Sequence, residues 1–115
     1  MKQWERLIDN TDYIFIVGSN KEENQYLIDS SEPNDLWFHI SEYPSCHVIC
    51  KLNHTTKVSK KHLNKIVKQG AVCCKSHSKY KNSKDVDITY TKIKHIENTD
   101  KIGSVIVNNS KIITI

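Results

Sequence analysis

The chain of 115 residues has no apolar run near the roughly 18 residues that a membrane-spanning helix needs. No apolar stretch follows its first residues, so we expect neither a secretory signal nor a membrane partner. With only three glycines and two prolines, it also lacks a flexible linker and a glycine-rich phosphate-binding loop. These absences predict a single domain over residues 1–115, in the cytoplasm or in the nucleus.

The four cysteines form no CxxC pair, and in a chain without signs of export we expect reduced thiols. Cys46 and Cys50 lie four residues apart on a predicted strand, about 13 Å, which is too far for one ion. Cys73 or Cys74 could chelate a metal together with His77, but two further ligands would have to come from the strands. We therefore predict no metal and no cofactor.

Groups for catalysis are equally sparse. Asp35, His39 and His47 offer the acid and base of a ribonuclease, but the chain has no serine or cysteine nucleophile motif. We predict a protein that is not an enzyme and has no small-molecule substrate. A histidine-based ribonuclease is the alternative.

Arginine and acidic residues are both unevenly distributed. Arg6 is the only arginine, and the block from Lys51 to Lys84 contains ten lysines and no Asp or Glu. The rest of the chain has seven basic residues against thirteen acidic ones. Crowded like charges repel unless a polyanion neutralises them, and binding to phosphates releases counterions. The block predicts a nucleic-acid ligand, with a solvated lysine-rich surface as the alternative.

The first half of the chain predicts strands with one short helix. Residues 13–17 read as a strand that ends at Gly18, and Ser19 then caps a helix to about Asp29, with Glu22 completing a capping box. Residues 36–41 alternate, with Leu36, Phe38 and Ile40 on one face and Trp37 and His39 on the other. Residues 47–51 return antiparallel to them as a hairpin.

The second half predicts a longer helix over residues 59–77, with an apolar face that includes Gly70 and packs on a sheet. Residues 86–91 form a strand, and residues 105–107 and 112–115 form a final hairpin around 108–110. The predicted fold is therefore α+β, a mostly antiparallel sheet packed with two helices.

Six segments, taken in order, resemble the NFACT RNA-binding domain (NFACT-R) family, and Asp-Leu-Trp-Phe-His is the most specific of them. They are residues 17–24, 35–39, 45–48, 71–79, 86–91 and 102–105. The resemblance implies an α+β domain that binds RNA, and larger family members belong to ribosome-associated quality control. It implies tRNA or ribosomal RNA as the ligand and the large ribosomal subunit as a partner. The chain has no room for the other domains of those proteins, so it resembles a stand-alone member.

The residues leave several alternatives open. Lysine supplies point charges without bidentate contacts to bases, so we expect weak sequence specificity, and DNA stays open as a ligand beside RNA. A different class of function is a protein-interaction adaptor on a ribosomal or stress-response assembly, which would use an exposed strand edge.

The aromatic candidates for RNA contact are Trp37, His39, His47 and Tyr80. On an open strand face, Trp37 would stack with an unpaired base, worth roughly 1–3 kcal/mol. Its alternative is to pack under the second helix. His39 and His47 lie on neighbouring strands, where they bind phosphate or satisfy local backbone groups.

The other candidates surround the two helices. Asn20, Lys21 and Asn24 lie at the start of the first helix, whose free N–H groups favour an anion, although ordinary capping explains them as well. A stripe of lysines follows the second helix and continues into the next loop, where phosphate contact is most expected. Its members, with one serine, are Lys61, Lys65, Lys68, Lys75, Ser78, Lys79 and Lys81. We expect the lysines of the 51–84 block to form one continuous surface.

Overall fold

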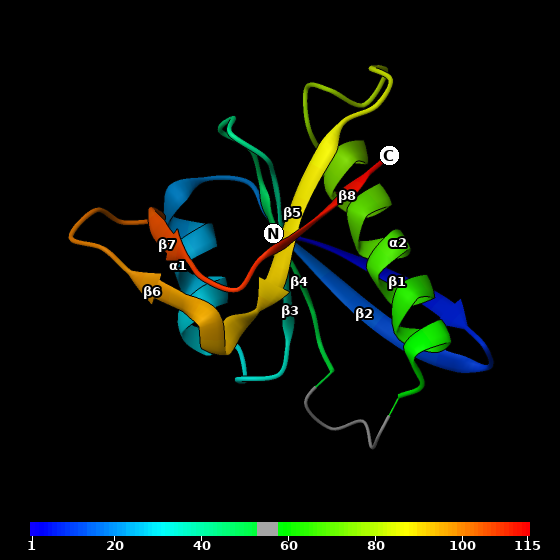
Figure 1. The fold of residues 1–115 in the computed structure, drawn as a ribbon. Coiled ribbons are helices and arrows are strands. Elements are labelled where there is room, and N and C mark those ends of the chain that lie inside the picture. The colour runs from blue at the N-terminus through cyan, green and yellow to red at the C-terminus, as the bar shows by residue number, and fades with distance from the viewer. Residues whose placement is uncertain (53–57) are drawn as a thin grey trace.

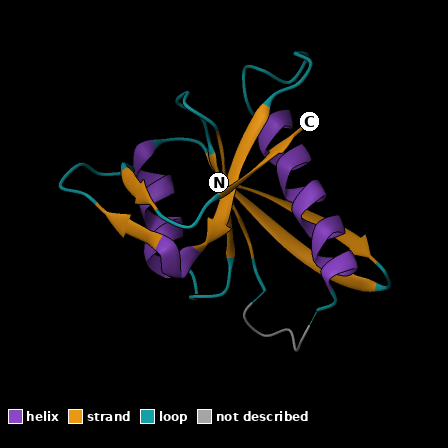
Figure 2. Cartoon of the chain, viewed as in Figure 1, coloured by secondary structure: helices purple, strands orange, loops and turns teal. Residues whose placement is uncertain are grey.

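The computed structural model describes residues 1–52 and 58–115, and its main element is an antiparallel sheet of six strands in the order β1-β2-β4-β3-β5-β8 (Figure 1). The strands are β1 (Lys2–Ile8), β2 (Thr11–Gly18), β3 (Leu36–Ile40), β4 (His47–Cys50), β5 (Asp87–Lys92) and β8 (Lys111–Thr114). Two helices, α1 (Lys21–Ser30) and α2 (Lys60–Ser76), flank this sheet (Figure 2). The predicted α+β class is confirmed.

The side chains of β3 alternate between the two faces of the sheet, and each face packs against one helix. Leu36, Phe38 and Ile40 belong to the core under α2, whereas Trp37 packs in a second cluster with Leu27 of α1. We call these the α2 face and the α1 face. A short sheet of β6 (Ile96–Asn98) and β7 (Val105–Val107) adds apolar side chains to the cluster on the α1 face. A single turn of 3-10 helix, η1 (Ile93–His95), connects β5 to β6.

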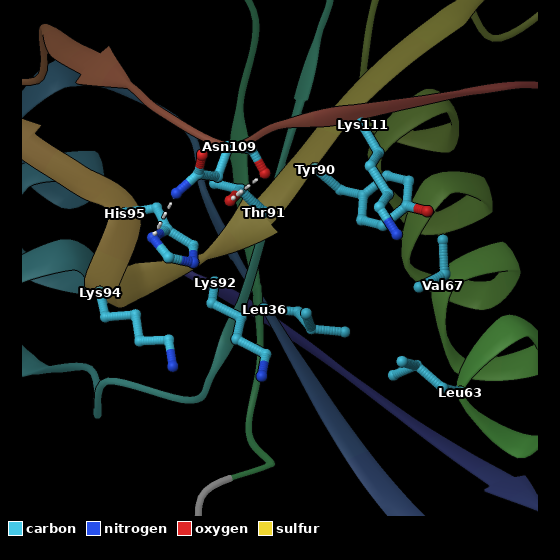
Figure 3. A pocket seen from close by; sticks show the side chains of 10 residues that line it. All are labelled: Leu36, Leu63, Val67, Tyr90, Thr91, Lys92, Lys94, His95, Asn109 and Lys111. Carbon is cyan, nitrogen blue, oxygen red and sulfur yellow. Dashed lines mark hydrogen bonds between the residues drawn. The ribbon is translucent and has the colours of Figure 1, made fainter. Parts of the chain in front are cut away.

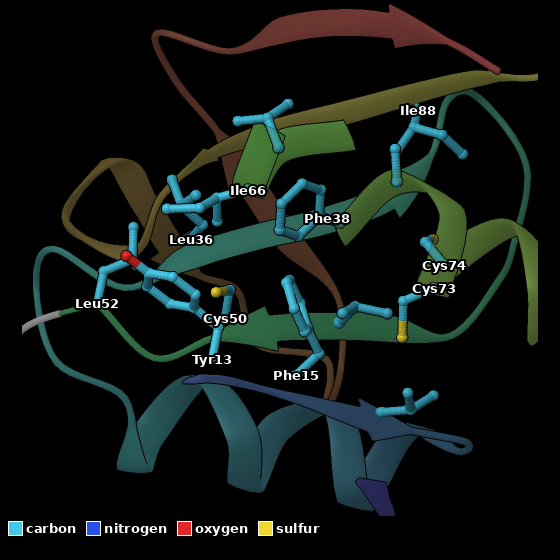
Figure 4. Close-up of a cluster of buried hydrophobic side chains, with 14 of the residues drawn as sticks. Tyr13, Phe15, Leu36, Phe38, Cys50, Leu52, Ile66, Cys73, Cys74 and Ile88 are labelled. Carbon is cyan, nitrogen blue, oxygen red and sulfur yellow. The ribbon is translucent and has the colours of Figure 1, made fainter. Parts of the chain in front are cut away.

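The core under α2 contains the larger cluster of buried side chains, drawn in Figure 4. Phe15, Phe38 and Ile66 are fully buried there. Gly70 lets α2 approach β3, because a Cβ atom at this position would lie 2.2 Å from Cζ of Phe38. The predicted packing of Gly70 against the sheet is confirmed.

Both helices begin with a side-chain cap. Asn20 caps α1, since its Oδ1 accepts a hydrogen bond from the backbone N–H of Glu23 at 2.9 Å. The Ser19 N–H in turn donates to the Glu23 carboxylate at 2.9 Å. The N-cap is therefore Asn20, one residue later than the predicted Ser19, and its partner is Glu23 instead of Glu22. In α2, Ser59 accepts from the His62 N–H at 3.1 Å.

One strand was missed, and one predicted strand pairing was wrong. Residues 2–8 form the edge strand β1, which the sequence pattern did not indicate because Leu7 is exposed and only Ile8 is buried. The predicted final hairpin does not form, since β7 pairs with β6 and β8 pairs with β5. These pairings are long-range choices that local alternation does not determine.

Within residues 1–52 and 58–115, neither helix has both the length and the apolar character that crossing a membrane would require.

Candidate nucleic-acid interface

The predicted site residues do not form one surface, because the six-stranded sheet separates them. Trp37 and the start of α1 lie on the α1 face, whereas the lysines of α2 lie beyond the opposite face. The two groups therefore belong to separate surfaces.

Trp37 has no open face for a base, because only 2% of its surface is exposed. It packs with Leu27, Ile28 and Ile49 in the cluster under α1. Its indole Nε1–H donates to Nδ1 of His47 at 3.2 Å, so the polar edge of the ring is satisfied inside the protein. The expected stacking platform is a core residue, and it packs on the α1 side rather than under the second helix.

His39 and His47 complete a ring cluster with Trp37. His39 stacks on Trp37 at a centroid distance of 5.5 Å, and His47 meets both rings edge-on at 5.2 Å and 5.1 Å. Burial, followed by the nearby charge of His39, lowers the pKa of His47 to about 3. Burial also lowers the pKa of His39. Both imidazoles are therefore neutral near pH 7, which disfavours a phosphate contact through a charged ring.

The polar residues at the start of α1 mostly serve the fold. Asn20 caps the helix, and Asn24 is buried with its Oδ1 accepting from the backbone N–H of His47 at 3.2 Å. Lys21 is exposed and lines a hollow of about 470 Å³ together with Trp37, His39 and His47. Of the three residues, only Lys21 offers a charge to a ligand.

The predicted lysine stripe on α2 divides into different environments. Lys61 and Lys68 are exposed and lie seven residues apart, which is about two turns of helix. Lys65 forms a 2.8 Å ion pair with Asp9 in the β1–β2 turn. The Lys65 hydrogen bond, followed by that of His62, lowers the pKa of this carboxyl. Lys75 donates to the backbone oxygen of Ile115 at 2.9 Å, which fastens the end of the chain to α2.

The loop after α2 contains the remaining candidates. Ser78 is occupied by its own backbone, since its Oγ donates to the Lys75 oxygen at 2.8 Å and accepts from the Tyr80 N–H at 3.1 Å. Tyr80 packs partly buried against Tyr43, with ring centroids 5.5 Å apart. Lys79 and Lys81 are exposed. Lys79 Nζ lies 5.5 Å from the Tyr80 ring centroid, a cation–π geometry.

Acids from elsewhere in the chain compensate part of the lysine block. Asp9 pairs with Lys65, and the fully buried Asp35 pairs with Lys51 at 3.1 Å. Lys57, which belongs to the same block, lies outside the described residues. In the described part of the chain, four predicted lysines on α2 and its following loop have neither an ion pair nor a hydrogen bond from the side chain, and we call them the α2 basic surface. They are Lys61, Lys68, Lys79 and Lys81.

Sequence reasoning missed a second basic site, a cleft of about 240 Å³ on the α2 face (Figure 3). Exposed lysines of β5, η1 and β8 line it, namely Lys92, Lys94 and Lys111. Leu63 and Val67 of α2 form an apolar wall. These lysines lie outside the acid-free block and on three separate elements, so they form no lysine-rich run in the sequence. The pairing of Tyr90 with Lys111 across β5 and β8 unites the site.

The thiols show no arrangement for metal binding. Within the described residues, no three His, Cys, Asp or Glu side chains gather as ligands for an ion. Cys50, Cys73 and Cys74 are buried in the core in Figure 4, and burial raises the pKa of Cys73 to about 12. Such thiols are protonated near pH 7 and behave as small apolar side chains.

Comparison with known families gives one match across almost the whole chain. Residues 2–110 match the family described as NFACT protein RNA binding domain. The C-terminal part of a fibronectin/fibrinogen-binding protein from Streptococcus suis has the same fold, with a TM-score of 0.79 and 22% identity. That similarity covers 100% of this chain and 45% of the other one.

Two curated proteins are also similar. A coiled-coil domain-containing protein 25 homolog of Dictyostelium discoideum is 31% identical over 115 residues, which covers 92% of this chain and 52% of that protein. The Rqc2 homolog RqcH of Bacillus subtilis is 28% identical over 83 residues, covering 71% of this chain and 13% of RqcH. The chain thus spans about half or less of the length of these relatives.

Proposed function

The chain belongs to the NFACT protein RNA-binding domain family, and we propose that it binds tRNA or ribosomal RNA without catalysing a reaction. The family match over residues 2–110 carries this proposal. The α2 basic surface supports it, because its lysines are exposed and free to neutralise phosphates.

The role of the phosphate contacts follows from the chemistry of lysine. An ammonium group attracts a phosphate as a point charge and reads no base edge by a bidentate contact. Lys61 and Lys68 would lie along an RNA backbone beside α2, with Lys79 and Lys81 extending the contact into the loop. We expect high affinity at low salt and weak dependence on sequence.

Similarity to RqcH supports a role in ribosome-associated quality control, with the large ribosomal subunit as the assembly that presents the RNA. In this proposal the chain contributes contact with RNA. Activities that depend on the parts of RqcH outside the matched region are not assigned to this chain. The cytoplasm is then the compartment in which it acts.

A binding module fits the histidines better than a nuclease does. A general base needs a pKa near the working pH and access to the substrate. His47 is buried with a pKa of about 3, and its Nδ1 accepts the indole hydrogen bond of Trp37. We therefore propose structural roles for His39 and His47.

A second candidate function is a protein adaptor, and the edge strand β1 favours it. β1 pairs with β2 on one side only, which leaves a row of backbone groups at the sheet edge over Lys2–Ile8. A peptide could extend the sheet there by strand addition.

Titrating labelled tRNA, a ribosomal RNA fragment and duplex DNA at several salt concentrations separates these functions. RNA binding by the α2 basic surface predicts a steep fall of log affinity with log salt. Lys61→Glu/Lys68→Glu should then weaken RNA binding by about tenfold or more. Lys2→Glu/Lys101→Glu is the matched control, since both lysines are exposed and lie outside this surface. Equal losses in the two variants, or a flat salt dependence, would contradict the proposed interface.

A further inference from the structure

The cleft on the α2 face combines three positive charges with an aromatic and aliphatic wall. Lys92, Lys94 and Lys111 are exposed, and none of them forms an ion pair with any residue in 1–52 or 58–115. Of the described residues that line the cleft, none is acidic. Charges of one sign that converge on a hollow attract an anion and raise its local concentration.

Sheet geometry brings the charges and the aromatic ring together. Tyr90 and Lys92 are two residues apart on β5, so their side chains leave the same face of the sheet, roughly 7 Å apart. Lys111 is the direct partner of Tyr90 on β8. The Tyr90 ring stacks on Phe38 at a centroid distance of 6.0 Å and remains partly exposed to the cleft. A partly exposed aromatic side chain therefore lies on the same face of the sheet as two lysines that line the cleft.

Much of the remaining lining of the cleft is apolar. Leu63 and Val67 of α2 and Leu36 of β3 line the cleft together with Tyr90. At about 240 Å³, the cleft is smaller than the roughly 300–1,000 Å³ typical of sites for drug-sized ligands. One planar group fits this space better than an extended ligand does.

Polar groups at one end of the cleft can recognise a heterocycle. Figure 3 shows Asn109 beside His95, and Asn109 Nδ2 lies 3.3 Å from His95 Nδ1. An asparagine amide offers both a donor and an acceptor, which match the mixed edge of a base. An acidic peptide would satisfy the lysines but would leave the aromatic and aliphatic wall unused.

We propose that this cleft binds one unpaired nucleotide of RNA, with its base against Tyr90, Leu63 and Val67 and its phosphates at Lys92, Lys94 and Lys111. The proposal rests on the proposed RNA-binding function and specifies one contact within it. It makes the domain prefer single-stranded or looped RNA over a duplex, because a paired base cannot enter the cleft. The α2 basic surface would bind the phosphates of both forms.

The test compares a labelled single strand of about 12 nucleotides with a blunt RNA duplex, by fluorescence anisotropy. Tyr90→Leu keeps apolar contact with Phe38 but removes the planar ring. It should weaken single-strand binding by about tenfold, within the range for loss of one stacked base, and leave duplex binding unchanged. Tyr26→Leu is the matched control, because Tyr26 is exposed on α1. A thermal unfolding curve confirms that each variant is folded.

Lys92→Gln/Lys111→Gln provides a second test that does not depend on core packing, since both side chains are exposed. It should lower the salt slope for the single strand by roughly 1.4, the expectation for two lost phosphate contacts. The control is Lys2→Gln/Lys101→Gln, which removes the same charge elsewhere. The cleft proposal is overturned if both lysine pairs give the same loss, or if Tyr90→Leu weakens duplex and single strand equally. If the unaltered protein binds neither RNA, the proposed function itself fails.

Discussion

On the α1 face of the sheet, polar side chains bond to one another, whereas in the cleft on the α2 face three lysines form no ion pair within the described residues. Trp37 donates to His47, and the backbone N–H of His47 donates to Asn24. Lys92 and Lys111, by contrast, extend from paired strands into an open cleft. The two regions lie on opposite faces of one sheet. The polar groups named on the α1 face have partners inside the protein, whereas the lysines of the cleft have charges available to a ligand.

This difference shows why a distinctive motif is not always a contact site. The Asp-Leu-Trp-Phe-His string is the most specific part of the family resemblance, and its members are mainly structural. Asp35 is fully buried and accepts from the backbone N–H groups of Glu32 at 2.9 Å and Leu52 at 2.8 Å. Trp37 and Phe38 pack on opposite faces of the sheet. Buried polar groups of this kind need partners inside the protein, because leaving them unpaired is costly.

Trp37→Ala should have the largest effect, because it removes a core side chain of the α1 face. Removing this buried indole should lower the free energy of unfolding by about 3–5 kcal/mol, because a cavity remains and the His47 acceptor loses its donor. Chemical denaturation measures the loss, and Trp4→Ala, at a partly buried position on β1, should lose less. RNA affinity of the folded fraction should stay within about twofold of the unaltered protein. A large drop in that affinity would place the α1 face in the interface.

Gly70→Ala tests the packing on the other face, because it adds a methyl group between α2 and the sheet. The new Cβ would lie 2.2 Å from the Phe38 ring, which is fully buried and has no room to retreat. Overpacking should lower the free energy of unfolding by about 2 kcal/mol despite the better helix propensity of alanine. Gln69→Ala, one residue earlier on α2, serves as the control in the same denaturation experiment. Unchanged stability of Gly70→Ala would show that α2 can move away from the sheet.

Acidification should lower the free energy of unfolding through the buried His47 on the α1 face. In the folded protein His47 has a pKa of about 3, while in the unfolded chain its pKa is about 6.5. The unfolded state therefore binds more protons between these values, so stability is highest above about pH 6.5 and falls as the pH decreases. The expected contribution is up to about 1.4 kcal/mol per pH unit.

Denaturation curves between pH 7 and about 5 test this in the unaltered protein and in His47→Gln. The variant should lose the His47 share of the pH slope, whatever its stability at pH 7. His95→Gln is the control on the opposite side of the sheet. An identical slope in His47→Gln would show that His47 is not held neutral by the fold.

The smallest expected effect concerns the ion pair between Lys65 and Asp9. Asp9→Asn removes the carboxylate that neutralises Lys65, so RNA affinity at low salt should rise by about twofold. Asp12→Asn makes the same change of net charge nearby, at an acid on β2 that has no ion pair with a described residue. Its increase should be smaller. Equal increases would mean that only the net charge matters and that Lys65 has no special position.

Much of the local structure was predictable from residues alone. The alternation of Leu36, Trp37 and Phe38 predicted two faces correctly, and apolar spacing predicted α2 to within one residue at either end. The edge strand β1 was missed because half-exposed strands carry a weak pattern. The pairing of β8 with β5 was missed because a connection of 18 residues separates them, and local spacing does not encode such partners.

The candidate site was less predictable than the fold. The acid-free block between Lys51 and Lys84 indicated the α2 basic surface. It did not reveal that Asp35 and Asp9, from outside the block, form ion pairs with Lys51 and Lys65. Nor did it indicate Lys92, Lys94 and Lys111, which only the sheet and η1 bring together.

By itself, the sequence determined the elements with strong periodicity, the family and the excess of lysine, because each depends on residues that are near one another in the chain. Only the tertiary structure decided which lysines keep a free charge and that Trp37 is enclosed under α1. Those outcomes depend on distance in space, since an ion pair or a buried contact forms between residues that the chain separates by many positions.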